Sequence, residues 1–119
     1  MLETVIELTN QYIKNMPKNE RKKYGQFFTS KETARFMAEL YNIPDNKPKV
    51  SILDAGAGSG ILSCALIERL EQMASVQTIE LTCYENDANI LGLLEENLHT
   101  CQVNSKKDVK IEIVTDNYI

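Results

Sequence analysis

Residues Ser51–Gly60 read Ser-Ile-Leu-Asp-Ala-Gly-Ala-Gly-Ser-Gly, an apolar run that ends in Asp54 and continues into glycines at alternate positions. A short apolar run closed by a turn signal predicts a strand, and a glycine backbone can adopt positive φ and approach a ligand closely. A helix predicted over 59–73 would direct its N-terminal amides toward a molecule bound in this loop. The stretch therefore predicts a strand, a ligand loop and a helix, arranged as in sites for adenosine-containing ligands.

A second acid follows the next predicted strand, which covers 79–84. Glu85 follows the last residue of this strand, and a carboxylate there can accept hydrogen bonds from two ribose hydroxyls. The glycine spacing disfavours a dinucleotide, because Ile61 occupies the place of the third glycine in G-x-G-x-x-G. The alternative is an ordinary βαβ unit with a tight turn and a solvated acid.

Strands and helices alternate along the rest of the chain. Apolar spacing predicts helices over 2–15, 31–41 and 87–101 and strands over 50–54, 79–84 and 109–115. Helical crossovers between strands favour a parallel sheet, and open sheets of this kind bind ligands outside the carboxyl ends of their strands. Asp54, the glycine loop, Glu85 and Asp116 all fall at those ends.

The segment between the first two predicted helices is basic. It carries Lys14, Lys18, Arg21, Lys22 and Lys23, with Glu20 as the opposing charge. This pattern predicts a solvated connection after Pro17, with a contact to a phosphate backbone as the alternative.

The next stretch, 24–30, predicts a glycine turn that leads into the second helix. Thr29 followed by Glu32 matches a capping box, in which the threonine hydroxyl satisfies a helix amide. An apolar stripe on that helix is predicted to lie in the core rather than against a cofactor; it consists of Phe36, Met37, Leu40 and Tyr41.

Composition sets the broad class. A chain of 119 residues with 43% apolar and 25% charged residues predicts one globular domain. A net charge of −4 does not indicate a nucleic-acid binder as a whole, and no stretch resembles a membrane span or a signal segment, which predicts a cytoplasmic protein. Cys64, Cys83 and Cys101 suggest neither a disulfide framework nor a zinc site, so we expect reduced, buried thiols and no metal.

Together these motifs resemble the amino-terminal half of an S-adenosylmethionine-dependent DNA adenine-N6 methyltransferase of restriction-modification type. The specific part is the motif order, in which Gly25-Gln26-Phe27-Phe28-Thr29 precedes the glycine loop. The resemblance covers 24–117. It implies a Rossmann-like α/β methyltransferase fold, here the first half of a parallel sheet with three strands and crossover helices, preceded by two N-terminal helices.

The resemblance also implies the cofactor, S-adenosylmethionine, and the residues that hold it. Residues 1–48 would form a helical segment with a cofactor-contacting loop over 24–30, and 49–119 a partial cofactor-binding α/β domain. The methionine end would meet Phe28 and Thr29, the ribose would meet Glu85, and the adenine amino group would donate to Asp116. The implied contacts are Phe28, Thr29, Asp54, Ala55, Gly56, Ala57, Gly58, Glu85, Asn86 and Asp116. Asn86 departs from the family, which usually has an apolar side chain there.

The family's catalytic Asn-Pro-Pro-Tyr element does not occur in this sequence, whose prolines are Pro17, Pro44 and Pro48. In such enzymes this element binds a flipped adenine. We therefore expect a fragment that carries the donor half of the site, has no catalytic residue and is inactive alone, with DNA contacts mostly from other regions. The strand over 50–54 would be an unpaired edge, which predicts dimerisation or aggregation.

Two alternatives to the DNA enzyme stay open. One is a methyltransferase acting on RNA, protein or a small molecule, since such enzymes share the cofactor loop. The other is a non-enzymatic module that binds the cofactor. A nicotinamide-dependent dehydrogenase is a weaker third reading, because the glycine spacing disfavours it.

Overall fold

The architecture is taken from a computed structural model, which describes residues 1–44 and 46–116, without the side chains of 25–27. The described part contains helices and strands in this order: α1 (Leu2–Lys14), α2 (Lys18–Phe27), α3 (Lys31–Glu39), β1 (Lys49–Asp54), α4 (Ile61–Glu71), β2 (Thr78–Tyr84), α5 (Ala88–Asn104) and β3 (Asp108–Val114). The predicted strands and crossover helices are therefore confirmed to within a few residues at their ends. Asn117, the last residue of the predicted resemblance, lies outside the described residues.

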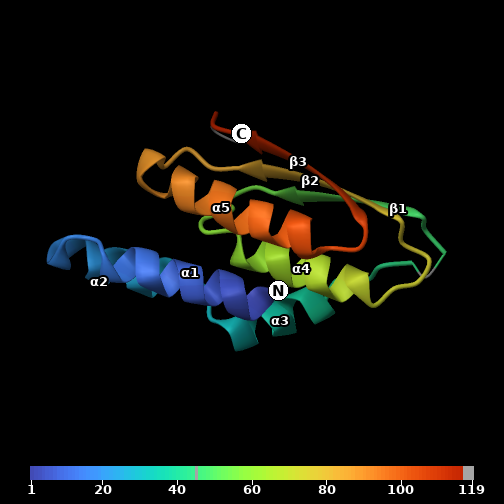
Figure 1. Cartoon of the computed structure of the whole chain (residues 1–119), viewed down its shortest axis with the longest axis horizontal. Coiled ribbons are helices and arrows are strands. Elements are labelled where there is room, and N and C mark those ends of the chain that lie inside the picture. Colours follow the sequence, from blue (N-terminus) through green and yellow to red (C-terminus); the bar gives the residue numbers. More distant parts are fainter. Residues whose placement is uncertain (45, 117–119) are drawn as a thin grey trace.

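The three strands form one parallel sheet in the order β1-β2-β3. Ile52 is in register with Leu81, and Leu81 with Ile111. Because the strands are parallel, their carboxyl ends lie together along one side of the sheet, which we call its carboxyl edge and which lies toward the left of Figure 1. The predicted α/β fold with a parallel sheet is confirmed.

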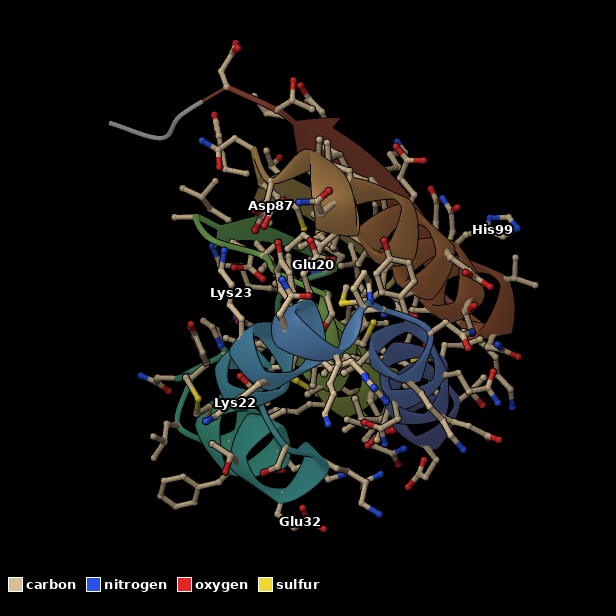
Figure 2. The ribbon with its side chains drawn as sticks, turned by 90° about the vertical axis from the view of Figure 1, so that its left-hand side faces the viewer. Glu20, Lys22, Lys23, Glu32, Asp87 and His99 are labelled. Atoms are coloured by element: carbon tan, nitrogen blue, oxygen red, sulfur yellow. The ribbon has the colours of Figure 1, made fainter. Side chains whose placement is uncertain are left out.

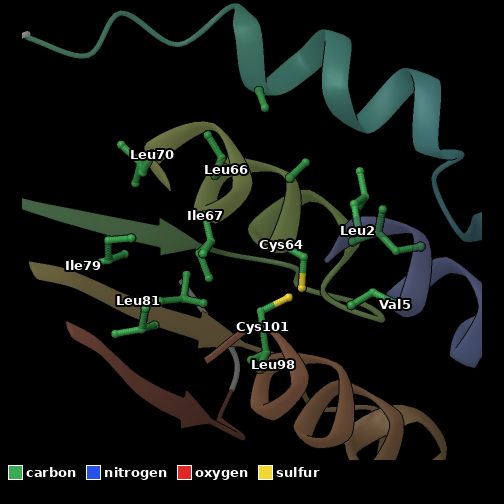
Figure 3. Close-up of a cluster of buried hydrophobic side chains, with 14 of the residues drawn as sticks. Leu2, Val5, Cys64, Leu66, Ile67, Leu70, Ile79, Leu81, Leu98 and Cys101 are labelled. Atoms are coloured by element: carbon green, nitrogen blue, oxygen red, sulfur yellow. The ribbon is translucent and has the colours of Figure 1, made fainter. Parts of the chain in front are cut away.

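The helices lie on one side of this sheet (Figure 1). Ile79, Leu81 and Cys83 of β2 are buried, whereas the alternate residues of the strand are half-buried on the opposite face. The core between sheet and helices includes the thiols of Cys64 and Cys101, which point toward each other in Figure 3. All three cysteines are free and buried, as predicted.

The prediction of a basic connection and a glycine turn between the first two helices was wrong, because the chain forms α2 there. Pro17 takes the N-cap position, and Lys, Arg and Glu are good helix formers. A single glycine inside a helix costs about 1 kcal/mol, which tertiary contacts can offset. Tyr24, which is 5% exposed, supplies such a contact. Three helices therefore precede the sheet rather than two.

Two predictions about α3 were also wrong. The N-cap is Ser30, whose Oγ accepts a hydrogen bond from the backbone N–H of Thr33 at 3.2 Å, so Thr29 is not the capping residue. The buried face consists of Ala34 and Ala38, which pack in the core with α4. The apolar stripe predicted for the core is instead exposed, at 65% for Phe36, 38% for Met37, 68% for Leu40 and 51% for Tyr41.

No helix within the described ranges is long and apolar enough to cross a membrane. β1 is an outer strand of the sheet, as predicted, and Leu53 at its carboxyl end is 53% exposed.

Candidate functional site

The glycine loop connects β1 to α4 at the carboxyl edge of the sheet. Gly60 is the N-cap of α4 with φ of 83°, and its N–H donates to the carbonyl of Ala57 at 2.8 Å. A Cβ atom on Gly60 would lie 2.9 Å from Leu94 Cδ1, so this glycine lets α5 pack closely. A Cβ on Gly56 would meet no atom within 4 Å, so the loop is open at this position.

Glu85 holds this loop against the end of β2. Its Oε1 accepts a hydrogen bond from the N–H of Gly58 at 2.8 Å, and its Oε2 accepts one from the N–H of Asp87 at 3.1 Å. The N–H of Ala57 donates to the carbonyl of Tyr84 at 3.1 Å, which ties the same two segments together. An ionised carboxylate has about four lone-pair sites. Glu85 can therefore orient the loop and still accept from a ligand, and its predicted ribose contact stays a prediction.

Asp54 is fixed from the other side by α4. The buried hydroxyl of Ser63 donates to Asp54 Oδ2 at 2.7 Å and lies 3.7 Å from the thiol of Cys83. Burial raises the pKa of Cys83 to about 11, so this thiol is protonated at neutral pH and is not a nucleophile. Sequence reasoning missed Ser63, although its place in the first turn after the loop directs it toward the end of β1.

The segment after α2 is held close to the glycine loop by Tyr24. Its hydroxyl donates to Asp87 Oδ2 at 2.7 Å, and this hydrogen bond raises the pKa of Tyr24. The ring of Tyr24 stacks on Phe28, with centroids 6.1 Å apart. Tyr24 and Asp87 therefore position Phe28 and Thr29 near the carboxyl edge of the sheet, a role that the sequence did not reveal.

A cavity of about 250 Å³ lies between the segment after α2 and the glycine loop. Its lining includes these of the predicted site residues: Phe28, Thr29, Asp54, Gly56, Ala57 and Gly58. The other four predicted residues do not line it: Ala55, Glu85, Asn86 and Asp116. They follow the carboxyl ends of β1, β2 and β3, at the same edge of the sheet. A cavity of about 890 Å³ adjoins the first one beside α1 and shares Phe28, Thr29 and Ile61 with it.

Asn97 supports the loop from α5. This side chain is fully buried, and its Nδ2 donates to the carbonyl of Ser59 at 2.8 Å and to Thr9 Oγ1 at 3.1 Å. The two hydrogen bonds connect α1, α5 and the glycine loop. Asn97 was also missed from the sequence, because an amide in a helix carries no local signal of what it will contact.

The described residues contain no group of three or more His, Cys, Asp or Glu side chains that would suit a metal ion. Backbone amides, carboxylates and apolar side chains make up the candidate site. Such an arrangement can bind a polar small molecule along the edge of the sheet.

Comparison with known proteins identifies the family of this chain. Type II methyltransferase M.PstI of Providencia stuartii is 32% identical over 83 residues, which is 70% of this chain and 16% of that protein. A solved Listeria monocytogenes protein, proposed to be a class I S-adenosylmethionine-dependent methyltransferase, is 18% identical with a TM-score of 0.47, over 97% of this chain and 46% of its own. The family model for N-6 DNA methylases matches residues 4–117. Since this match spans the glycine loop and nearly the whole chain, the chain belongs to the N-6 DNA methylase family.

Proposed function

We propose that this chain is the S-adenosylmethionine-binding part of an enzyme that methylates the N6 amino group of adenine in DNA. The observation that carries the proposal is the cavity in which Phe28 and Thr29 lie with Asp54 and the glycine loop. These two segments are far apart in the sequence, and Tyr24 and Glu85 hold them together. Membership of the N-6 DNA methylase family supports DNA as the substrate.

The proposed orientation of the cofactor assigns each part of the molecule to residues at the carboxyl ends of the strands. The methionine end lies in the cavity between Thr29 and Asp54, and the nucleoside lies along the carboxyl ends of β2 and β3. There Glu85 accepts from the ribose hydroxyls, Asn86 lies beside the adenine, and Asp116 accepts from the adenine amino group. Ala55 contributes backbone only.

The cavity is smaller than the roughly 300–1,000 Å³ typical of small-molecule sites. Most of the nucleoside would therefore lie on an open surface, and we expect weak binding, with a Kd in the high micromolar range. The sequence contains no Asn-Pro-Pro-aromatic element, so the proposal assigns donor binding to this chain and no step of the methyl transfer.

Calorimetric titration with S-adenosylmethionine tests the proposal, with Glu85→Gln as the variant and NAD as the comparison ligand. We expect saturable binding that Glu85→Gln weakens about tenfold or more, because hydrogen bonds to a charged group contribute about 1.5–3 kcal/mol. Glu95→Gln is the matched control, since Glu95 is exposed on α5 and forms no part of the site. Equal binding by the two variants, or tighter binding of NAD, would contradict the proposal.

A further inference from the structure

The segment over 14–23, which runs from the last residue of α1 into α2, is strongly basic in a chain that is acidic as a whole. Residues 14–23 carry five basic side chains and one acidic one, a net charge of +4, whereas the whole chain carries −4 and the remainder therefore −8. All five cations are exposed, and none takes part in the ion pairs found among the described residues: Lys14, Lys18, Arg21, Lys22 and Lys23. The charge of this segment is therefore opposite in sign to that of the rest of the chain.

The position of α2 connects this charge with the methyl-donor site. The helix ends at Phe27, and the two residues after it line the cavity at the glycine loop. The hydrogen bond from Tyr24 to Asp87 holds α2 against the start of α5, at the end of the molecule where the strands reach their carboxyl termini. Figure 2 looks onto this end, with Lys22 and Lys23 on the surface of α2 and Asp87 on the neighbouring segment.

We propose that the exposed basic face of α2 binds the phosphodiester backbone of the DNA substrate beside the methyl-donor site. The inference rests on the proposed function, because it assigns the polyanion to the DNA that is methylated. Lys18, Arg21 and Lys22 have i, i+3, i+4 spacing and so lie on one face of the helix. A helix of 10 residues is about 15 Å long, which matches about four phosphates along one strand of duplex.

One feature favours DNA over a membrane surface, and a second explains how an acidic chain can bind a polyanion at α2. The described side chains of α2 include no exposed apolar residue, since Tyr24 is buried, whereas helices that bind at a membrane surface insert an apolar face. The Debye length is about 10 Å at 0.1 M salt, so the acidic charges on distant parts of the chain are largely screened. A phosphate backbone approaching α2 therefore meets mainly the local positive charge.

The test is fluorescence anisotropy of a labelled DNA duplex titrated with this chain across a series of salt concentrations. The variant carries Lys18→Gln, Arg21→Gln and Lys22→Gln together. Each phosphate contact contributes about −0.9 to the slope of log K against log salt, so three lost contacts should reduce the slope by roughly 2.7. At low salt we expect at least about tenfold weaker binding of the duplex by the variant.

The matched control carries Lys47→Gln, Lys106→Gln and Lys110→Gln, which changes the net charge by the same amount. These lysines are exposed and lie toward the amino ends of β1 and β3, away from the site. The control should bind the duplex within about twofold of the unmodified chain and keep its salt slope. Circular dichroism and thermal unfolding of all three proteins check that the substitutions leave the fold intact.

Several results would overturn the inference: no duplex binding by the unmodified chain at low salt, equal losses in the two variants, or tighter binding to phosphatidylserine vesicles or single-stranded RNA than to the duplex. Titration of the same variant with S-adenosylmethionine separates this inference from the proposed function. If cofactor binding persists while duplex binding does not depend on α2, the inference alone fails. If S-adenosylmethionine does not bind to the unmodified chain, the proposed function fails whatever the DNA result.

Discussion

Gly56 and Gly58 differ in what the folded chain requires of them. A Cβ on Gly56 meets no atom within 4 Å and its φ is ordinary, whereas Gly58 has φ of +58°. A residue with a side chain at positive φ costs about 1–2 kcal/mol. The folded structure therefore explains a glycine at position 58 but not at position 56, where we propose the close approach of a ligand as the reason.

We predict that Gly56→Ala retains the free energy of unfolding but weakens S-adenosylmethionine binding, because the new methyl group would occupy ligand space. Gly58→Ala should lower the free energy of unfolding by about 1–2 kcal/mol because of the positive φ. Denaturant unfolding and calorimetric titration of both variants measure the two effects. Unchanged cofactor binding by Gly56→Ala would show that the ligand does not approach the loop at this position.

The sequence predicted which residues lie close together better than it predicted what holds them there, and their role as a ligand site stays a prediction. Asp54 and the glycine loop were predicted from the end of a strand, and Thr29 from a sequence motif; all of them line one cavity. Asn97 could not be predicted, since it is recognised by a contact made only when the chain folds, whereas the place of Ser63 in the first turn of α4 was a signal that was missed. Asn97 donates to Ser59, which is 38 positions away in the sequence, and periodicity carries no information about such pairs.

At the scale of helices, prediction failed where tertiary contacts outweighed pattern. α2 has no apolar periodicity over its described side chains, and it is anchored by Tyr24. α3 has a clear apolar stripe, but it packs on α4 through Ala34 and Ala38, because small side chains allow two helices to approach closely. Strands were predicted better, since each is a short apolar or alternating run that ends at an acidic residue.

The packing of α4 on β2 makes stability sensitive to alkaline pH. Burial raises the pKa of Cys83 from its ordinary value of 9.0 to about 11. Between these values the unfolded chain has lost the thiol proton and the folded chain has kept it, so the free energy of unfolding falls as pH rises from 9 to 11. Below pH 9 this group causes no dependence on pH.

We predict that Cys83→Ala has a shallower decline in the free energy of unfolding over this pH range, by up to about 1.4 kcal/mol per pH unit. Urea unfolding at a series of pH values measures the slope of the free energy of unfolding against pH. The comparison uses this slope, because loss of the sulfur atom also lowers the absolute stability. Lysine and tyrosine titrations are common to both proteins and cancel in the comparison. Identical slopes would mean that the thiol of Cys83 titrates normally in the fold.

For the whole molecule, exposed apolar side chains lie along the free edge of β1. Tyr41 and Leu53 are each more than half exposed. A cavity of about 470 Å³ runs along β1 and is lined by Tyr41, Ile43 and Leu53 among others. Unpaired backbone groups on an edge strand recruit other chains, and exposed apolar patches mark sites of association. We propose that two copies of this chain pair through β1.

We predict reversible association that Leu53→Lys weakens by at least about tenfold, because burial of a leucine side chain contributes about 1.5–3 kcal/mol and a lysine on an edge strand opposes pairing. Sedimentation velocity over a wide range of protein concentration measures the effect. Val103→Lys is the matched control, since Val103 is 66% exposed on α5 and the substitution also replaces an apolar side chain with one positive charge. A monomer at every concentration would exclude the association. Equal weakening by both substitutions would exclude β1 as the contact, because Leu53 lies on that strand and Val103 does not.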